Sequence, residues 1–590
     1  MRPVSVRTNL SLTMCIPERP GKAGRSGDGE GGVGSPNANS ACLAIAGVVE
    51  WAHDMTWEWS MEAWLTPERI AQALPVIKAA FWGLFGLALL LAIRRSWAGK
   101  QQKTISRAYR IFFVIVAMLF AAILVYQATW QLAGFARPDF IDFMKRYNRR
   151  PDNPVANIVR GSIYDARGND LAVTDPAMPA RRWYPLGAAA GHLIGYDHSQ
   201  FGLAGIEAAD RDALNGITRE QGPEWENFRR NLLKRDDVRG RHVMLTVHAA
   251  LQQEAHALMK GRKGAVVLLD PSNGAILALY SAPGFDPNDV NASWFERKDP
   301  DARLLNRALQ GLYPAGSTFK LLVAAAALDQ GINPVIDCPA EGYRAGTANK
   351  PIRDHEYYDY QRRGRTWPGH GALNMREALA KSSNVYFARL GVQLGGERLY
   401  AAVVRCGMTK PWTVFDGSSG AMGCTAGRFP ALTDRDIAKT AQISIGQGDM
   451  VITPLHMAML AGAIGRQGVM WKPRLDVRAP AQPLETVFKA EAARTLAGMM
   501  RQAVMSGTGR GADLPGLQVA GKTGTAQNPH GADHGWFVGF APVTQPRVAF
   551  AVVVEGGGYG SQSAVPVVAG LLRKADEEGL FAAPAGKAGR

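Results

Sequence analysis

The chain has 590 residues, a formal net charge of +16 and 47% hydrophobic residues. This length exceeds what a single hydrophobic core usually serves, so at least two folded domains are expected. The basic balance suits nucleic acid, an anionic membrane surface or an anionic polymer. However, the absence of zinc-finger spacing, an RNP-like strand and a basic heptad region argues against a nucleic-acid partner.

The N-terminal part predicts a tail and two hydrophobic helices. Residues 1–70 are expected to be a disordered tail, because the first 40 are rich in Gly, Ser, Pro, Arg and Asn without an apolar period. Residues 75–93 are just long enough to span a bilayer but contain a lysine, so a buried core helix is the alternative. Residues 111–130 carry no charge and end in Tyr126 and Trp130, which is typical of a transmembrane helix.

The loop between these two apolar stretches predicts the orientation of the chain. It contains six Arg or Lys residues and no acidic residue, which favours a cytoplasmic position. Everything after about residue 131 is then expected outside the cytoplasm. The predicted localisation is therefore the inner (cytoplasmic) membrane, with the folded domains on its periplasmic side.

The remaining sequence predicts two folded domains. Residues 150–255 are polar, with short strand-like runs, and are expected to form a small α+β module. Residues 260–575 begin with two β-rich runs joined by Asn273-Gly274, a hairpin signature, continue with long helices and end in strands. This order predicts an antiparallel sheet with a helical subdomain, an α+β architecture. Residues 576–590 are expected to form a second disordered tail.

The five cysteines are scattered and include no CxxC pair, which argues against a zinc site. Cys406 and Cys424 could be bridged in an extracytoplasmic domain, whereas separate, partly buried thiols are the alternative.

One segment carries candidate chemistry. Pro314 and Gly316 precede an Ala/Leu-rich helix that is expected to begin at about Ser317. Ser317 and Lys320 are three residues apart and therefore share a face of the first helical turn. Serine needs an adjacent base to act as a nucleophile, and a helix N-terminus disfavours a protonated lysine, so a neutral Lys320 could accept the serine proton. Taken alone, the pair is better explained by Ser317 capping the helix.

Two later segments strengthen the catalytic interpretation. Ser382 and Asn384 follow a predicted helix and can direct a hydroxyl and an amide toward a cleft, although alone they indicate only a polar helix end. The segment Lys522–Thr525 precedes the strand-like GWFVGF and is expected on an edge strand. Its lysine and hydroxyls suit an anionic substrate, and its glycine permits a close approach of the backbone.

The three segments occur in the order SxxK, SxN and KTG, a set typical of penicillin-binding proteins and serine β-lactamases. Over about residues 155–570 the chain resembles a class B, monofunctional penicillin-binding protein. Further segments follow that family's pattern: Arg160–Gly168, Gly205–Glu207, Gly446–Gly448, Gly507–Gly509 and the GWFVGF strand. The resemblance implies a transpeptidase domain of the penicillin-binding and serine β-lactamase type, preceded by a small pedestal module and membrane helices.

The resemblance also implies a reaction. Ser317 would attack the penultimate D-alanine carbonyl of a D-Ala-D-Ala stem peptide, and an amine of a neighbouring strand would resolve the acyl-enzyme into a cross-link. Lys320 would be the general base, Ser382 and Lys522 would relay protons, and Asn384 would hold the donor peptide. The implied substrate-binding residues are Thr523, Gly524 and Thr525. No metal or cofactor is implied, and β-lactams should acylate Ser317.

The implied partners follow from what the sequence lacks. Because no glycosyltransferase-like segment precedes the module, the resemblance implies a separate glycan polymerase of the SEDS type and other membrane proteins of cell-wall synthesis. The alternatives are a D,D-carboxypeptidase, a β-lactamase or β-lactam sensor on the same fold, and a non-catalytic scaffold. A hydrolase needs a device that activates water, which the sequence does not reveal, and a scaffold has no need for an intact Ser/Lys/Asn/Lys set.

Overall fold

The computed structural model describes residues 83, 94, 111–112, 114–127, 159–175, 178–217, 240–295, 299–529 and 531–582. The chain divides into two units, residues 1–145 and 146–590. In the first unit, residues 114–127 are helical and expose large apolar side chains such as Phe120 and Leu124. Within the described residues, no helix combines the length and the apolar character that a membrane crossing needs. The predicted tail at 1–70 and nearly all of 75–93 lie outside the described residues.

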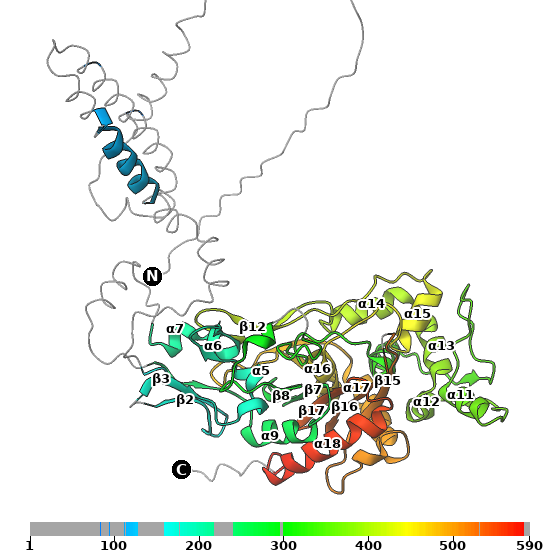
Figure 1. Ribbon diagram of the computed structural model, residues 1–590. Coiled ribbons are helices and arrows are strands. Elements are labelled where there is room, and N and C mark those ends of the chain that lie inside the picture. Colours follow the sequence, from blue (N-terminus) through cyan, green and yellow to red (C-terminus); the bar gives the residue numbers. More distant parts are fainter. Residues whose placement is uncertain are drawn as a thin grey trace, which may run out of the picture. The chain divides into compact units, whose positions relative to one another are not determined.

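The second unit is built on an antiparallel sheet of five strands in the order β15-β16-β17-β7-β8 (Figure 1). Its strands are β7 (Gly264–Leu269), β8 (Ile276–Ala282), β15 (Ala520–Ala526), β16 (His534–Ala541) and β17 (Val548–Val554). The predicted hairpin is confirmed as the β7–β8 pair, and β15 lies at the edge of the sheet, as predicted.

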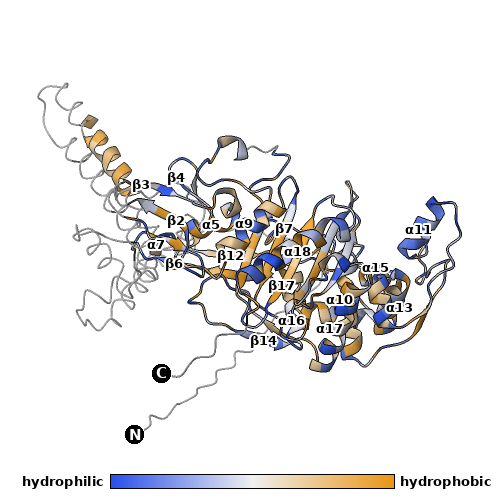
Figure 2. Ribbon diagram, turned by 90° about the horizontal axis from the view of Figure 1, so that it is seen from below, coloured by the Kyte–Doolittle hydropathy of each residue, from blue (hydrophilic) through white to orange (hydrophobic). Residues whose placement is uncertain are grey.

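Both faces of the sheet are covered by helices, which explains why β7, β8 and β17 are almost continuously apolar (Figure 2). Because side chains alternate along a strand, Val266 and Leu268 face one layer and Val267 and Leu269 the other. The first layer contains α9 (Ala249–Leu258) and α18 (Gly560–Glu577), and the second contains α16 (Pro454–Gly465).

A helical subdomain is inserted between β8 and β15, so the predicted order of strands, helices and strands is confirmed. Its helices are α10 (Lys320–Asp329), α11 (His355–Arg362), α12 (Met375–Lys381), α13 (Asn384–Leu394), α14 (Gly396–Arg405), α15 (Ile437–Ser444) and α17 (Ala490–Met505). The small hairpins are β9 (Ile336–Cys338) with β10 (Gly371–Leu373), β11 (Trp412–Asp416) with β12 (Ala421–Cys424), and β13 (Val469–Trp471) with β14 (Pro483–Thr486). Helix α10 is buried almost all round, as its Ala/Leu-rich sequence predicts for a central helix.

The N-terminal module has its own sheet, in the order β3-β2-β1-β6. Its strands are β1 (Ile163–Tyr164), β2 (Asp170–Asp175), β3 (Met178–Trp183) and β6 (Val243–Met244), with the hairpin β4 (Asp197–His198) and β5 (Gly202–Leu203). Its short helices are α5 (Gly191–Ile194), α6 (Gly205–Ala209) and α7 (Arg211–Leu214). The β11–β12 turn docks on these helices, since the Ser419 hydroxyl accepts the Asp212 N–H at 2.8 Å. The module and the subdomain that carries α11 to α13 lie at opposite ends of the unit (Figure 1).

One sequence-based expectation is corrected. Residues 576–582 do not belong to the disordered tail predicted at 576–590, because α18 continues to Glu577 and Leu580 and Phe581 pack against the core; residues 583–590 lie outside the described part. Of the two alternatives for Cys406 and Cys424, a disulfide or separate thiols, the structure shows separate thiols, because both cysteines are free and buried. The Cys424 thiol instead contacts the Thr453 hydroxyl at 3.1 Å.

Candidate active site

Ser317 lies in a single 3₁₀ turn, η4 (Gly316–Phe319), that leads directly into α10. Its side chain is half-buried, and within the described residues its hydroxyl forms no hydrogen bond. The N-cap position of this turn is Ala315, and the Thr318 hydroxyl donates to the Ala315 carbonyl at 2.6 Å. Ser317 therefore does not cap the helix, which leaves its hydroxyl available for chemistry.

Glycines on both sides hold this turn in place. Gly316 has a φ of +53° and donates its N–H to the Gly446 carbonyl at 2.9 Å. A Cβ on Gly524 would lie 2.9 Å from the Thr318 side chain. The predicted close approach at Gly524 is thus made to the serine-bearing turn, so this glycine sets the spacing between β15 and Ser317.

Lys320 is completely buried and points its amine at the α12–α13 junction. Its Nζ donates to the Ser382 carbonyl at 2.6 Å and to Asn384 Oδ1 at 2.8 Å, and lies 3.4 Å from Ser382 Oγ. Burial lowers the pKa of Lys320 to about 7, against the opposing effect of Asp354 and Glu356. A neutral amine with both N–H groups engaged in this way keeps its lone pair free to accept a proton.

Lys522 approaches the same hydroxyl from β15. Its Nζ donates to Ser382 Oγ at 2.8 Å and to the Thr523 carbonyl at 2.9 Å. Burial, together with the nearby charge of Lys320, lowers the pKa of Lys522 well below its ordinary value. The Ser382 hydroxyl therefore lies between two buried amines whose pKa values are both lowered, which suits it to pass protons between them.

The junction of α12 and α13 positions Ser382 and Asn384. Ser382 has a φ of +60° and ends α12, and Asn384 begins α13. Asp354, which is fully buried, accepts the backbone N–H groups of Asn384 and Val385 and the Ser383 hydroxyl. Sequence reasoning missed Asp354, because a single aspartate in the segment PIRDHEYY carries no motif.

These groups open onto a cleft of about 480 Å³. Six of the eight predicted site residues line it: Ser317, Ser382, Asn384, Thr523, Gly524 and Thr525. The other two, Lys320 and Lys522, lie buried behind Ser382. The structure therefore brings all eight together from three separate parts of the chain.

Three further residues of the cleft had no predicted role. The Thr508 hydroxyl is hydrogen bonded to that of Thr523, and it comes from the GTG segment that follows α17. His355 on α11 and Tyr559 at the start of α18 also line the cleft, and His355 Nε2 lies 2.5 Å from the Tyr559 hydroxyl. The GTG triplet was the only signal for any of them, because the other two come together through tertiary structure alone.

The fold and this arrangement define a class of enzyme in which the enzyme's own serine becomes acylated with the help of a buried lysine. Residues 264–573 match the transpeptidase domain of penicillin-binding proteins. The chain is 32% identical over 465 residues to peptidoglycan D,D-transpeptidase PbpA of Mycolicibacterium smegmatis, across 71% of this chain and 89% of that protein. It is 31% identical over 440 residues to peptidoglycan D,D-transpeptidase MrdA of Acinetobacter baumannii, across 65% of this chain and 64% of that protein.

Solved structures agree with this assignment. Penicillin-binding protein A of M. tuberculosis, as a ceftriaxone acyl-enzyme, matches with a TM-score of 0.62 and 28% identity, over 71% of this chain and 99% of that one. Pseudomonas aeruginosa PBP2 in complex with WCK 5153 matches with a TM-score of 0.59 and 28% identity, over 73% of this chain and 98% of that one. The chain belongs to the transpeptidase family of penicillin-binding proteins.

Proposed function

We propose that this chain is a monofunctional peptidoglycan D,D-transpeptidase, which cross-links stem peptides through an acyl-enzyme on Ser317. The observation that carries the proposal is the free Ser317 hydroxyl at the cleft, one helical turn from a buried lysine whose pKa is about 7. The transpeptidase relatives and the acyl-enzyme structure of a neighbour support it.

In the acylation step, the hydrogen bonds of Lys320 position its amine to act as the general base. Its amine accepts the Ser317 proton as Oγ attacks the penultimate D-alanine carbonyl. The backbone N–H groups of Ser317 and Thr525 stabilise the oxyanion, which contributes about 3 kcal/mol per donor. The Ser382 hydroxyl then passes a proton to the leaving D-alanine nitrogen and is reprotonated along the Lys320 and Lys522 amines.

Donor binding uses the hydroxyls of β15 and one amide. Thr523 and Thr525 bind the terminal carboxylate of the donor peptide, and Thr508 orients the hydroxyl of Thr523. The side chain of Asn384 accepts a hydrogen bond from Lys320 through Oδ1 and donates one N–H to the Arg353 carbonyl at 2.9 Å. One N–H of Asn384 therefore remains for the donor backbone, so this residue positions the base as well as the substrate.

Product analysis tests the proposal. The purified protein is incubated with labelled stem pentapeptides, an acceptor amine and, separately, a penicillin. A transpeptidase yields peptide dimers and a long-lived penicilloyl-enzyme. Shortened monomers without dimers would identify a D,D-carboxypeptidase, rapid penicillin turnover would identify a β-lactamase, and no acylation at all would leave only a scaffold.

The proposal extends to membrane attachment. Residues 111–130 anchor the chain in the inner membrane with the catalytic unit on the periplasmic side, where a SEDS-type glycan polymerase and other cell-wall synthesis proteins are its partners. The support is the charge-free sequence and the exposed apolar side chains of residues 114–127. Deletion of residues 75–130 is expected to move the protein from the membrane to the soluble fraction; continued membrane association would contradict the anchor.

A further inference from the structure

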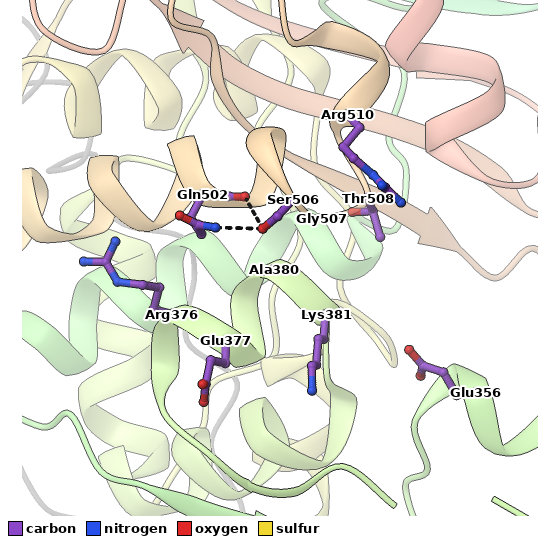
Figure 3. Close-up of a pocket in the computed structure, with 10 residues that line it drawn as sticks. All are labelled: Glu356, Arg376, Glu377, Ala380, Lys381, Gln502, Ser506, Gly507, Thr508 and Arg510. Atoms are coloured by element: carbon purple, nitrogen blue, oxygen red, sulfur yellow. Dashed lines mark hydrogen bonds between the residues drawn. The ribbon is translucent and has the colours of Figure 1, made fainter.

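A second depression, of about 630 Å³, lies beside the cleft between α12 and the C-terminal end of α17 (Figure 3). We name it the α12–α17 groove. Gly507 allows its two sides to approach, because a Cβ there would lie 2.6 Å from the Ala380 carbonyl oxygen. Its lining residues are Glu356, Arg376, Glu377, Ala380, Lys381, Gln502, Ser506, Gly507, Thr508 and Arg510.

In the part of the chain that the structure describes, the acidic residues of the groove have interaction partners, whereas its basic residues do not. Glu377 is held in the capping box at the start of α12, and Glu356 lies 3.5 Å from the ring of His370. The three cations are exposed and, within the described residues, form no ion pair or hydrogen bond through their side chains. They are Arg376, Lys381 and Arg510. An anionic ligand would therefore meet unpaired positive charge on both sides of the groove.

The groove is continuous with the cleft. Thr508, Lys381 and Glu356 line both. The Thr508 hydroxyl is bonded to that of Thr523, which we assign to the carboxylate of the departing D-alanine. The groove thus opens on the leaving-group side of Ser317.

The chemistry of the second half-reaction directs the acceptor to this side. The acceptor amine attacks the ester carbonyl that D-alanine has left; a C–N bond forms, the C–Oγ bond to Ser317 breaks, and the amine proton returns to Ser317 Oγ through Lys320. Because this step is the reverse of acylation with a different amine, the acceptor takes the place of D-alanine. A stem peptide is anionic, since it ends in a free carboxylate.

We propose that the α12–α17 groove binds the stem peptide of the acceptor strand, with Arg376 and Arg510 pairing its carboxylates. This inference rests on the proposed transpeptidase function. It names the part of the surface that decides whether the acyl-enzyme meets an amine of a second strand or water.

The test separates acceptor binding from acylation. The double variant Arg376→Glu/Arg510→Glu reverses both charges, and neither residue lines the cleft. Lys381 is left unchanged because it precedes Ser382. The matched control is Arg398→Glu, an exposed arginine on α14 that lies outside both depressions. The donor is a thioester analogue of acyl-D-alanine, and the acceptors are an amine-bearing stem peptide and its carboxamide form.

The double variant is expected to react with a fluorescent penicillin at the wild-type rate and to show an unchanged melting midpoint. Its kcat/KM for the carboxylate acceptor should fall about tenfold or more, while that for the carboxamide changes little and hydrolysis of the donor rises. The control should match the wild type in every measurement.

Equal use of the carboxylate acceptor by the double variant and the wild type would overturn the inference, as would a wild type that does not distinguish the two acceptors. Failure of the proposed function has a different signature, because the wild type would then take no penicillin label.

Discussion

At the scale of single residues, the two lysines that share the Ser382 hydroxyl decide when the enzyme can react. Lys320 must be neutral to accept the Ser317 proton, and burial brings its pKa to about 7. Protonation of Lys320 below that pH removes the lone pair of its amine. The titration of Lys522 is coupled to that of Lys320 through Ser382, whose Oγ lies 2.8 Å from the Lys522 Nζ. The site is therefore active on the alkaline side of this pKa, not the acid side.

The lowered pKa of Lys320 predicts how acylation depends on pH. The second-order rate constant with a β-lactam should rise with pH on a limb centred near pH 7, and fall about tenfold for each pH unit below it. Stopped-flow or gel-based labelling between pH 5 and about 9 measures this limb, within a range where the fold is checked by circular dichroism. A limb centred near 10, the ordinary value for lysine, would contradict the role of Lys320.

At the scale of elements, Asp354 joins the loop before α11 to the start of α13. We expect Asp354→Ala to cost about 1–3 kcal/mol, because the N–H groups of Asn384 and Val385 lose their buried acceptor. Acylation should fall as well, since Asn384 holds Lys320 at 2.8 Å. Urea unfolding and penicillin labelling measure the two effects. Glu397→Ala, which removes an exposed acid from the first turn of α14, should leave both unchanged.

Gly446 supports the turn that carries Ser317. Its φ is +75°, and a Cβ there would lie 1.8 Å from the Gly316 carbonyl oxygen. Gly446→Ala is therefore expected to cost about 3 kcal/mol or more and to slow acylation by displacing η4.

The control for Gly446→Ala is the same substitution at Gly498 on α17, where an added Cβ would meet nothing within 4 Å. Gly498→Ala should stabilise the protein by roughly 0.5–1 kcal/mol, because it removes a glycine from a helix interior. Thermal melts measure both effects. If the melting midpoints of Gly446→Ala and Gly498→Ala shift in the same direction, the proposed role of Gly446 in supporting the serine turn is contradicted.

The elements that the sequence predicted are those specified by short-range patterns. The Asn273-Gly274 turn predicted the β7–β8 pair, and the apolar strands and helices predicted the sheet and its inserted subdomain. Asp354 and Thr508 were missed because their roles depend on contacts with residues far along the chain. The C-terminal boundary was placed too early because polar residues near the end of α18 obscured the apolar contacts of Leu580 and Phe581.

At the scale of the whole molecule, the N-terminal module depends on one buried ionic cluster. Glu207 is fully buried and accepts hydrogen bonds at 2.7 Å from both Arg160 and Arg182. The cluster ties β3 and α6 to the segment that precedes β1. The module is joined in turn to the catalytic part, because Thr246 donates its N–H to the Leu475 carbonyl at 2.7 Å.

We predict that Glu207→Ala costs about 3–5 kcal/mol at pH 7, because it leaves the buried guanidinium of Arg182 without its ion-pair partner and Arg160 with only Asp197, at 3.3 Å. Burial alone would raise the pKa of Glu207, but Arg182 and Arg160 outweigh it and the pKa is lowered. Its stabilising effect is thus present above the unfolded pKa of about 4.3 and is lost as pH falls through the lower folded pKa.

Urea unfolding at neutral and acid pH tests this prediction. The difference between wild type and Glu207→Ala should be large at pH 7 and shrink as the solution becomes more acid than about pH 4. Glu485→Ala, at an exposed position on β14, should stay close to the wild type throughout. A difference that does not depend on pH would contradict the ionic origin of this stability.

The nucleophile is the claim on which the whole account depends, and covalent labelling tests it most directly. The wild type and Ser561→Ala, whose serine also lines the cleft, should both bind a fluorescent penicillin covalently. Mass spectrometry should place the label on the tryptic peptide Ala308–Lys320, in which Ser317 is the only serine. A folded Ser317→Ala variant should take no label; labelling that survives this substitution would contradict the account.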